Sequence, residues 1–181
     1  MSDSPGCALT RARLEALYVK TEKPLFNVVY RWLWSREEAH DVVQDAFLKL
    51  WAMRERVREE TVEPLVYRIA LNLAANRRRS RKVWQWLALD TVLPWWGRPD
   101  DEADPARRQE EALTRAAVDG LPEPLRQVVV LAEMSGLTYA QVGEVLGIPE
   151  GTVGSRRNRA LALLRERLGP LVHEEQAHDA A

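Results

Sequence analysis

The side chains of this sequence best suited to contact DNA lie together between residues 155 and 159. They are Ser155, Arg156, Asn158 and Arg159. Arg and Asn can form paired hydrogen bonds with base edges in the major groove. Ser and Arg can also bind phosphate oxygens. On one helix face, this set would combine base reading with attachment to the DNA backbone.

Two short helices joined by a tight turn are expected to position this polar set. Thr138 can cap the first helix, and Gln141 stands where a capping box requires Glu or Gln. Gly147 and Pro149 interrupt the pattern, because Gly favours a helix end and Pro a helix start. The second helix, from about Glu150, would lie in the major groove as in a helix-turn-helix. The alternative is an ordinary helical hairpin with a solvated basic face.

Composition indicates a mainly helical protein that does not bind DNA unaided. The 181 residues are 46% hydrophobic and carry a net charge of −1. A protein that binds DNA alone is usually more basic, since neutralising phosphates supplies much of the affinity. The near-neutral charge therefore suggests that another component helps to hold the DNA.

Several function classes are disfavoured by what the sequence lacks. Cys7 is the single cysteine, and the three histidines are scattered, so we expect no disulfide, metal or cofactor. There is no nucleophile–base set or phosphate loop, so we expect no enzyme. Neither a transmembrane stretch nor a signal peptide is visible, which predicts a cytoplasmic protein without membrane insertion.

A linker is expected at residues 83–112. It combines prolines with the acidic run 100–104, both typical of linkers. Its four tryptophans, Trp84, Trp86, Trp95 and Trp96, do not suit a fully solvated segment. They would pack either on one of the protein's own domains or on a partner.

Amphipathic helices are expected over residues 10–82. Ser35 can cap a helix whose apolar stripe leaves Asp41, Gln44 and Asp45 largely outside it. A later helix, about 64–79, is expected to turn Leu65, Ile69 and Leu73 inward. It ends in a basic run from Arg77 to Lys82, which is either a solvated helix end or a grip on phosphates.

Three segments resemble, in order, regions of the extracytoplasmic-function (ECF) sigma factors of RNA polymerase. Residues 41–51, DVVQDAFLKLW, are similar to the region 2 helix of that family. Residues 67–79, YRIALNLAANRRR, resemble its promoter-melting segment, and residues 121–160 resemble region 4. The resemblance covers about residues 10–168. It also fits the near-neutral charge, because sigma factors act as polymerase subunits.

The resemblance implies the roles of individual residues. Asp41, Gln44 and Asp45 match positions that dock on the β′ clamp helices of core polymerase, and an acidic face suits a basic partner; a solvated helix face is the alternative. Asn72 matches a position near the pocket for a flipped base of the −10 element, and Asn76 stands where many members carry Asp or Asn. The alternative for both is an exposed polar residue. DNA contacts in this region are also expected from Arg77 and Arg78, and the loop at about 54–62 would supply specificity.

In region 4 the resemblance places Ser155, Asn158 and Arg159 on the −35 element, with Arg156 on phosphate or base. Three positions depart from the family. Gly154 replaces a common Lys or Arg, and Leu65 replaces a common Trp. Arg157 stands where Leu or Ile often faces the core, so it would either extend to the surface or contact DNA.

The resulting prediction is an all-α protein with two small helical domains joined by a flexible linker. A region 2 helical bundle spans 10–82, a region 4 helix-turn-helix spans 113–168, and a tail spans 169–181. The resemblance implies an ECF sigma factor that binds RNA polymerase core through the β′ clamp helices and β flap. It would recognise the −10 and −35 elements of promoter DNA, with an anti-sigma factor as a candidate partner. The alternatives are a response regulator or repressor that binds DNA without polymerase, and an interaction scaffold.

Overall fold

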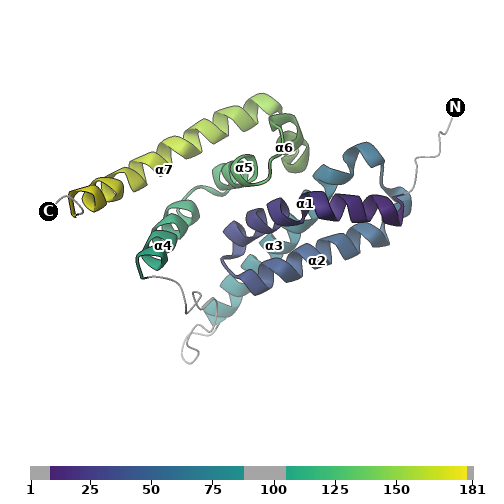
Figure 1. The fold of residues 1–181 in the computed structure, drawn as a ribbon, viewed down its shortest axis with the longest axis horizontal. Helices are drawn as coiled ribbons and strands as arrows, with labels where there is room; N and C mark the ends of the chain where they lie inside the picture. The colour runs from purple at the N-terminus through teal and green to yellow at the C-terminus, as the bar shows by residue number, and fades with distance from the viewer. Residues whose placement is uncertain (1–8, 88–104, 179–181) are drawn as a thin grey trace. The chain divides into compact units, whose positions relative to one another are not determined.

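Two compact helical units make up the protein (Figure 1). The computed structural model describes residues 9–87 and 105–178, and within these ranges there is no strand. Helices α1 to α3 belong to the first unit and helices α4 to α7 to the second. The predicted all-α fold with two helical domains is therefore confirmed.

Helix α1 (Arg11–Leu33) begins and ends at identifiable caps. The Thr10 side chain accepts a hydrogen bond from the Arg13 amide. Trp34 ends the helix in the left-handed conformation, with φ at 55°, and its amide donates to the Tyr30 carbonyl. Because a bulky residue rarely adopts this conformation, the surrounding contacts must hold Trp34 in place. One such contact is with the Arg31 guanidinium, 5.0 Å from the Trp34 ring.

Helix α2 (Arg36–Ala52) follows the predicted pattern closely. The Ser35 hydroxyl accepts a hydrogen bond from the Glu38 amide at 3.3 Å, which confirms the predicted cap. The apolar stripe is buried as expected, while Trp51 at its end is half-buried. Its buried members are Ala39, Val42, Val43, Ala46, Phe47 and Leu50.

Helix α3 (Val62–Leu87) packs against both α1 and α2 but is rotated relative to the prediction. Leu65, Ile69 and Leu73, expected to face inward, are only half-buried. The fully buried positions are Val66, Tyr67, Ala70 and Ala74, and Leu71 is buried as well. The inward face of α3 therefore combines small alanines, which let helices approach closely, with the larger Tyr67 and Leu71, and it is rotated from the predicted stripe of Leu65, Ile69 and Leu73.

Two short 3₁₀ turns connect α2 to α3. They are η1 (Arg54–Arg56) and η2 (Glu59–Thr61), and both lie within the loop expected to supply specificity contacts. Arg54 stacks on the Trp51 ring at 4.7 Å, and Val57 between the turns is buried. The loop is therefore anchored to the bundle at its start.

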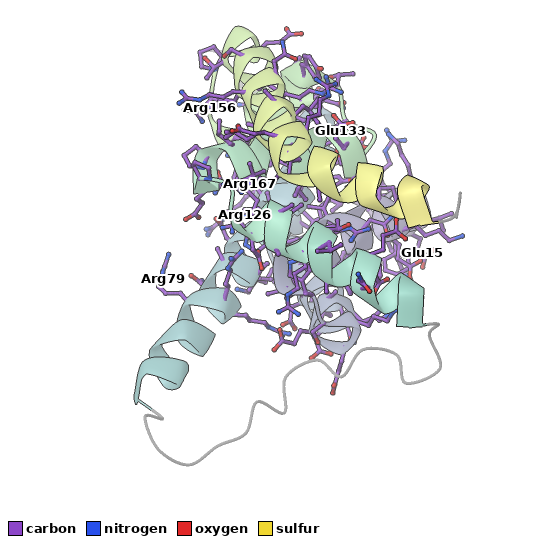
Figure 2. The ribbon with its side chains drawn as sticks, turned by 90° about the vertical axis from the view of Figure 1, so that its left-hand side faces the viewer. Glu15, Arg79, Arg126, Glu133, Arg156 and Arg167 are labelled. Carbon is purple, nitrogen blue, oxygen red and sulfur yellow. The ribbon has the colours of Figure 1, made fainter. Side chains whose placement is uncertain are left out.

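The second unit contains α4 (Pro105–Asp119), α5 (Glu123–Met134), α6 (Tyr139–Leu146) and α7 (Glu150–His178). Its core is built from fully buried side chains of α5, α6 and α7. Arg167 of α7 donates a hydrogen bond to the Ala117 carbonyl of α4 at 3.0 Å. Arg126, almost fully buried in α5, faces Asp119 at 3.6 Å (Figure 2). The core side chains include Val128, Leu131, Val142, Val153 and Ala160.

Only part of the expected linker lies within the residues that the structure describes. Helix α3 continues past residue 82, α4 begins at Pro105, and α7 extends past residue 168. The acidic run, Trp95 and Trp96 lie outside the described residues, as do the side chains of Trp84 and Trp86. No helix in the described part of the chain is long and apolar enough to cross a membrane.

Candidate functional site

The three predicted polymerase contacts lie along the outer ridge of α2. Asp41 and Gln44 are exposed, and Asp45 is half-buried with 46% of its side chain accessible. Gln44 lines a groove shared with α1, whereas Asp45 contacts α3. Because positions 41, 44 and 45 fall within about one helical turn, the ridge presents two carboxylates and one amide between the neighbouring helices.

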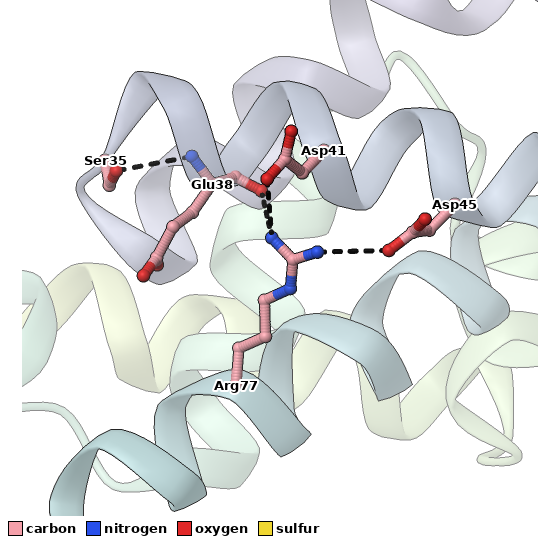
Figure 3. A network of polar contacts seen from close by, with 5 residues as sticks. All are labelled: Ser35, Glu38, Asp41, Asp45 and Arg77. Carbon is pink, nitrogen blue, oxygen red and sulfur yellow. Dashed lines mark hydrogen bonds and ion pairs between the residues drawn. The ribbon is translucent and has the colours of Figure 1, made fainter.

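One arginine of α3 binds both carboxylates of this ridge (Figure 3). The Nη2 atom of Arg77 lies 3.0 Å from Oδ2 of Asp45, and its Nη1 atom lies 3.5 Å from Oδ2 of Asp41. Nη1 also donates to the Glu38 carbonyl oxygen at 3.2 Å. The structure therefore joins two residues predicted to bind polymerase with one predicted to bind DNA.

An apolar groove of about 580 Å³ runs between α1 and α2 beside Gln44. The Tyr18 ring meets the Phe47 ring edge-on, with the centroids 4.9 Å apart. Burial, together with a hydrogen bond to Glu22, raises the pKa of Tyr18. Sequence reasoning did not find this groove, because its walls belong to two helices that were considered separately; they include Leu14, Phe26, His40, Leu48 and Trp51.

The outer face of α3 carries the two predicted base contacts. Asn72 and Asn76 are both exposed and lie one helical turn apart. The side-chain oxygen Oδ1 of Asn76 accepts a weak hydrogen bond from Nη1 of Arg79 at 3.4 Å. Arg78, next to Arg77, is half-buried. Two exposed amides thus lie on one side of this helix.

In the second unit, α6 and α7 form the predicted helix-turn-helix. The Thr138 hydroxyl accepts from the Gln141 amide at 3.2 Å, and the Gln141 side chain accepts from the Thr138 amide at 2.9 Å. Gly147 ends α6 in the left-handed conformation, with φ at 68°. A Cβ atom at Gly143 would lie 2.6 Å from the Ile148 carbonyl oxygen, so only glycine fits this close turn.

The predicted recognition residues lie opposite the buried side of α7. Ser155, Asn158 and Arg159 are exposed, and the half-buried Arg156 projects from the side of the helix (Figure 2). The Ser155 hydroxyl donates to the Thr152 carbonyl oxygen at 3.1 Å. The structure therefore brings together all four side chains of the polar set on one helix.

Arg157 behaves differently from its neighbours in α7. It lies on the core-facing side, between the buried Val153 and Ala160, and its side chain is 28% exposed. Its Nε atom donates to Glu133 of α5 at 2.5 Å, and this hydrogen bond raises the pKa of Arg157. The hydrogen bond to Glu133 therefore holds Arg157 against its own domain. An aliphatic side chain at this position could not make that contact.

The arrangement defines a class of DNA-binding protein with a helical bundle and a separate helix-turn-helix. Residues 17–83 match the family described as Sigma-70 region 2, and residues 111–164 match Sigma-70 region 4. The ECF RNA polymerase sigma-E factor of Haemophilus influenzae is 31% identical over 150 residues, which are 76% of this chain and 78% of that protein. The chain belongs to the ECF RNA polymerase sigma factors.

Other relatives agree with this assignment, and two solved structures share the fold. The RNA polymerase sigma-H factor of Pseudomonas aeruginosa is 29% identical over 88% of both chains. The SigE factor of Mycolicibacterium smegmatis is 30% identical over 80% of this chain but only 57% of its own length. The fold is shared with CnrH, solved with the cytosolic domain of CnrY, at a TM-score of 0.63 and 21% identity over 89% of this chain and 90% of that one.

A second solved structure, the RpoE sigma factor of Bartonella quintana bound to the anti-sigma factor NepR, has a TM-score of 0.60. It is 22% identical, and the alignment covers 86% of this chain and 91% of that one. As a sigma factor, the protein acts in promoter-specific initiation by RNA polymerase, and sigma factors are regulators without an enzymatic reaction of their own. Within the described residues, no group of three or more His, Cys, Asp or Glu could hold a metal.

Proposed function

We propose that this sigma factor divides its work between two domains, region 2 at residues 10–82 and region 4 at residues 113–168. Region 2 would bind core polymerase and the −10 element, and region 4 the −35 element. The observation that carries the proposal is the polarity of α7, which buries Val153 and Ala160 and exposes Asn158 and Arg159 on the opposite side. A recognition helix needs this division.

Promoter contact by region 4 rests on the capped turn before α7. The capping box of α6 and the tight approach at Gly143 fix how α7 leaves the turn. Arg159 and Asn158 can then reach base edges, while Ser155 and Arg156 bind the backbone. This domain would also contact the β flap of the polymerase, as the family resemblance implies.

Core binding by region 2 rests on the acidic ridge of α2. Asp41 and Asp45 supply negative charge and Gln44 supplies an amide next to the α1–α2 groove. This combination suits a basic partner such as the β′ clamp helices. Asn72 and Asn76, exposed on α3, would bind a base of the −10 element after it leaves the stack.

The remaining features follow from the partners. Because promoter DNA and polymerase are both cytoplasmic, we place the protein there, acting as a subunit that catalyses no reaction itself. CnrH and the Bartonella quintana RpoE were solved with CnrY and the anti-sigma factor NepR. An anti-sigma factor is accordingly proposed as a partner of this chain too.

In vitro transcription with core polymerase over a promoter library tests the proposal. We expect the full-length protein to select promoters with a common −10 and −35 sequence, and only in the presence of core enzyme. A chain that binds promoter duplex tightly by itself and does not support initiation would instead be a repressor or response regulator.

A further inference from the structure

Arg77 occupies a position that neither of the proposed interactions of region 2 explains. It belongs to the basic run of residues 77–82, which lies within α3 and not at its end as predicted, and its guanidinium is turned toward α2 (Figure 3). There it binds Asp45 at 3.0 Å, Asp41 at 3.5 Å and the Glu38 carbonyl at 3.2 Å. Its donors on both Nη atoms are therefore engaged within region 2.

This placement changes the charge of the proposed polymerase-binding ridge. A single cation between two carboxylates leaves a net charge of −1 where the sequence alone suggests −2. A basic partner approaching Asp41 and Asp45 must share the carboxylates with Arg77 or replace it. Both ion pairs of Arg77 use the Oδ2 atoms, so one atom of each carboxylate is committed to the internal contact.

The ion pairs of Arg77 with Asp41 and Asp45 are exposed enough to exchange one cation for another. The side chains are 31% exposed at Arg77, 59% at Asp41 and 46% at Asp45. Ion pairs that remain in contact with solvent contribute little net stability, because water compensates each charge when the pair opens. A partner cation can therefore substitute for Arg77 without unfolding the bundle.

We propose that Arg77 is an internal counter-ion that competes with core polymerase for Asp41 and Asp45, and that core binding releases it to contact a DNA phosphate. The inference rests on the proposed function of the α2 ridge. In the free protein, Arg77 moderates the acidic ridge and is itself withheld from DNA. In the holoenzyme, basic residues of the polymerase replace it, and its guanidinium becomes available to a DNA phosphate.

The competition predicts opposite effects of one substitution on the two partners. Arg77→Gln should tighten core binding by about three- to tenfold, because two exposed ion pairs no longer compete. The same substitution should weaken promoter binding by the holoenzyme and reduce its salt slope by about 1, as expected for one lost phosphate contact. An arginine that merely braced α2 against α3 would weaken both interactions together.

The test measures both affinities with full-length protein and bacterial core polymerase. Arg79→Gln is the matched control, since it removes the same charge from the same helix without an ion pair to the ridge. A second control repeats Arg77→Gln in a background of Asp41→Asn with Asp45→Asn. There the gain in core affinity should vanish, because no carboxylate remains to compete for.

Each outcome bears on the inference. Tighter core binding that depends on the two carboxylates supports it. Unchanged or weaker core binding by Arg77→Gln, or a gain that persists in the double Asn background, overturns it. An equal gain in core affinity by Arg79→Gln would show a general effect of removing positive charge, and it would overturn the inference as well. If the unaltered protein failed to bind core at all, the proposed function itself would fail, which separates the two conclusions.

Discussion

Arg157 and Arg159 of α7 are close in sequence, yet one serves the structure of the domain and the other lies on the proposed recognition surface. Arg159 is exposed on the face opposite the core. Arg157, two positions earlier, lies on the core side and binds Glu133 of α5. Since successive helical residues point about 100° apart, the two guanidiniums cannot serve the same surface.

Removing these two side chains separately should therefore give different results. Arg159→Ala is expected to cost about 1–3 kcal/mol on promoters that depend on the −35 element, and to relax the preference at one base position. Arg157→Ala removes the same charge but should leave the salt dependence of promoter binding unchanged. Equilibrium binding of holoenzyme to promoter variants across a salt series distinguishes them. A salt slope that falls by about 1 in Arg157→Ala would show that Arg157 contacts a phosphate after all.

Residue-level reasoning from the sequence succeeded where the partners are close in the chain. The polar set of α7 and the Thr138–Gln141 capping box could be predicted, because helical periodicity and capping are local. The ion pairs of Arg77 with Asp41 and Asp45 could not, since they join helices that the sequence pattern treats one at a time. The Arg157–Glu133 contact escaped prediction for the same reason.

Among the helices, starts were easier to predict than ends or rotation, since α3 and α7 both extend past their predicted ends. Ser35 and Thr138 mark the starts of α2 and α6 because their side chains satisfy free backbone amides. For α3 the large leucine and isoleucine side chains suggested the wrong inner face. Packing against two helices at once buries Ala70 and Ala74 together with Tyr67 instead, and that choice depends on tertiary structure.

The turn between α6 and α7 gives a test at this scale. Gly143→Ala places a methyl group 2.6 Å from the Ile148 carbonyl oxygen, so the backbone of the turn must move. We expect a loss of about 1–3 kcal/mol in the stability of the second unit, as for other overpacked sites. Thermal unfolding followed by circular dichroism measures it.

Gly151→Ala provides the matched control for that substitution. It lies in the first turn of α7 with no atom within 4 Å of the added Cβ. Alanine is the better helix former, so this variant should be as stable as the parent or more so. Equal stability of the Gly143→Ala and Gly151→Ala proteins would contradict the described turn.

For the whole molecule, the two units are expected to act at different steps of initiation. Region 4 would act when the promoter is still duplex, whereas Asn72 on α3 would act once a base has left the stack. Asn72→Ala should therefore spare closed-complex binding and impair opening. Permanganate footprinting of the start region reports the opening. Normal melting by this variant would rule out Asn72 as part of the base pocket.

We propose that the acidic ridge of α2 binds core polymerase, and reversing the charge of this ridge is the sharpest test of that claim. Asp41→Arg with Asp45→Arg should abolish binding to core, but it also sets two new cations against Arg77. Adding Arg77→Glu restores opposite charges inside region 2 without restoring an acidic ridge. We predict that the triple variant regains the thermal stability of the parent and still fails to co-purify with core polymerase. Normal holoenzyme assembly by this stable, charge-reversed protein would contradict the claim.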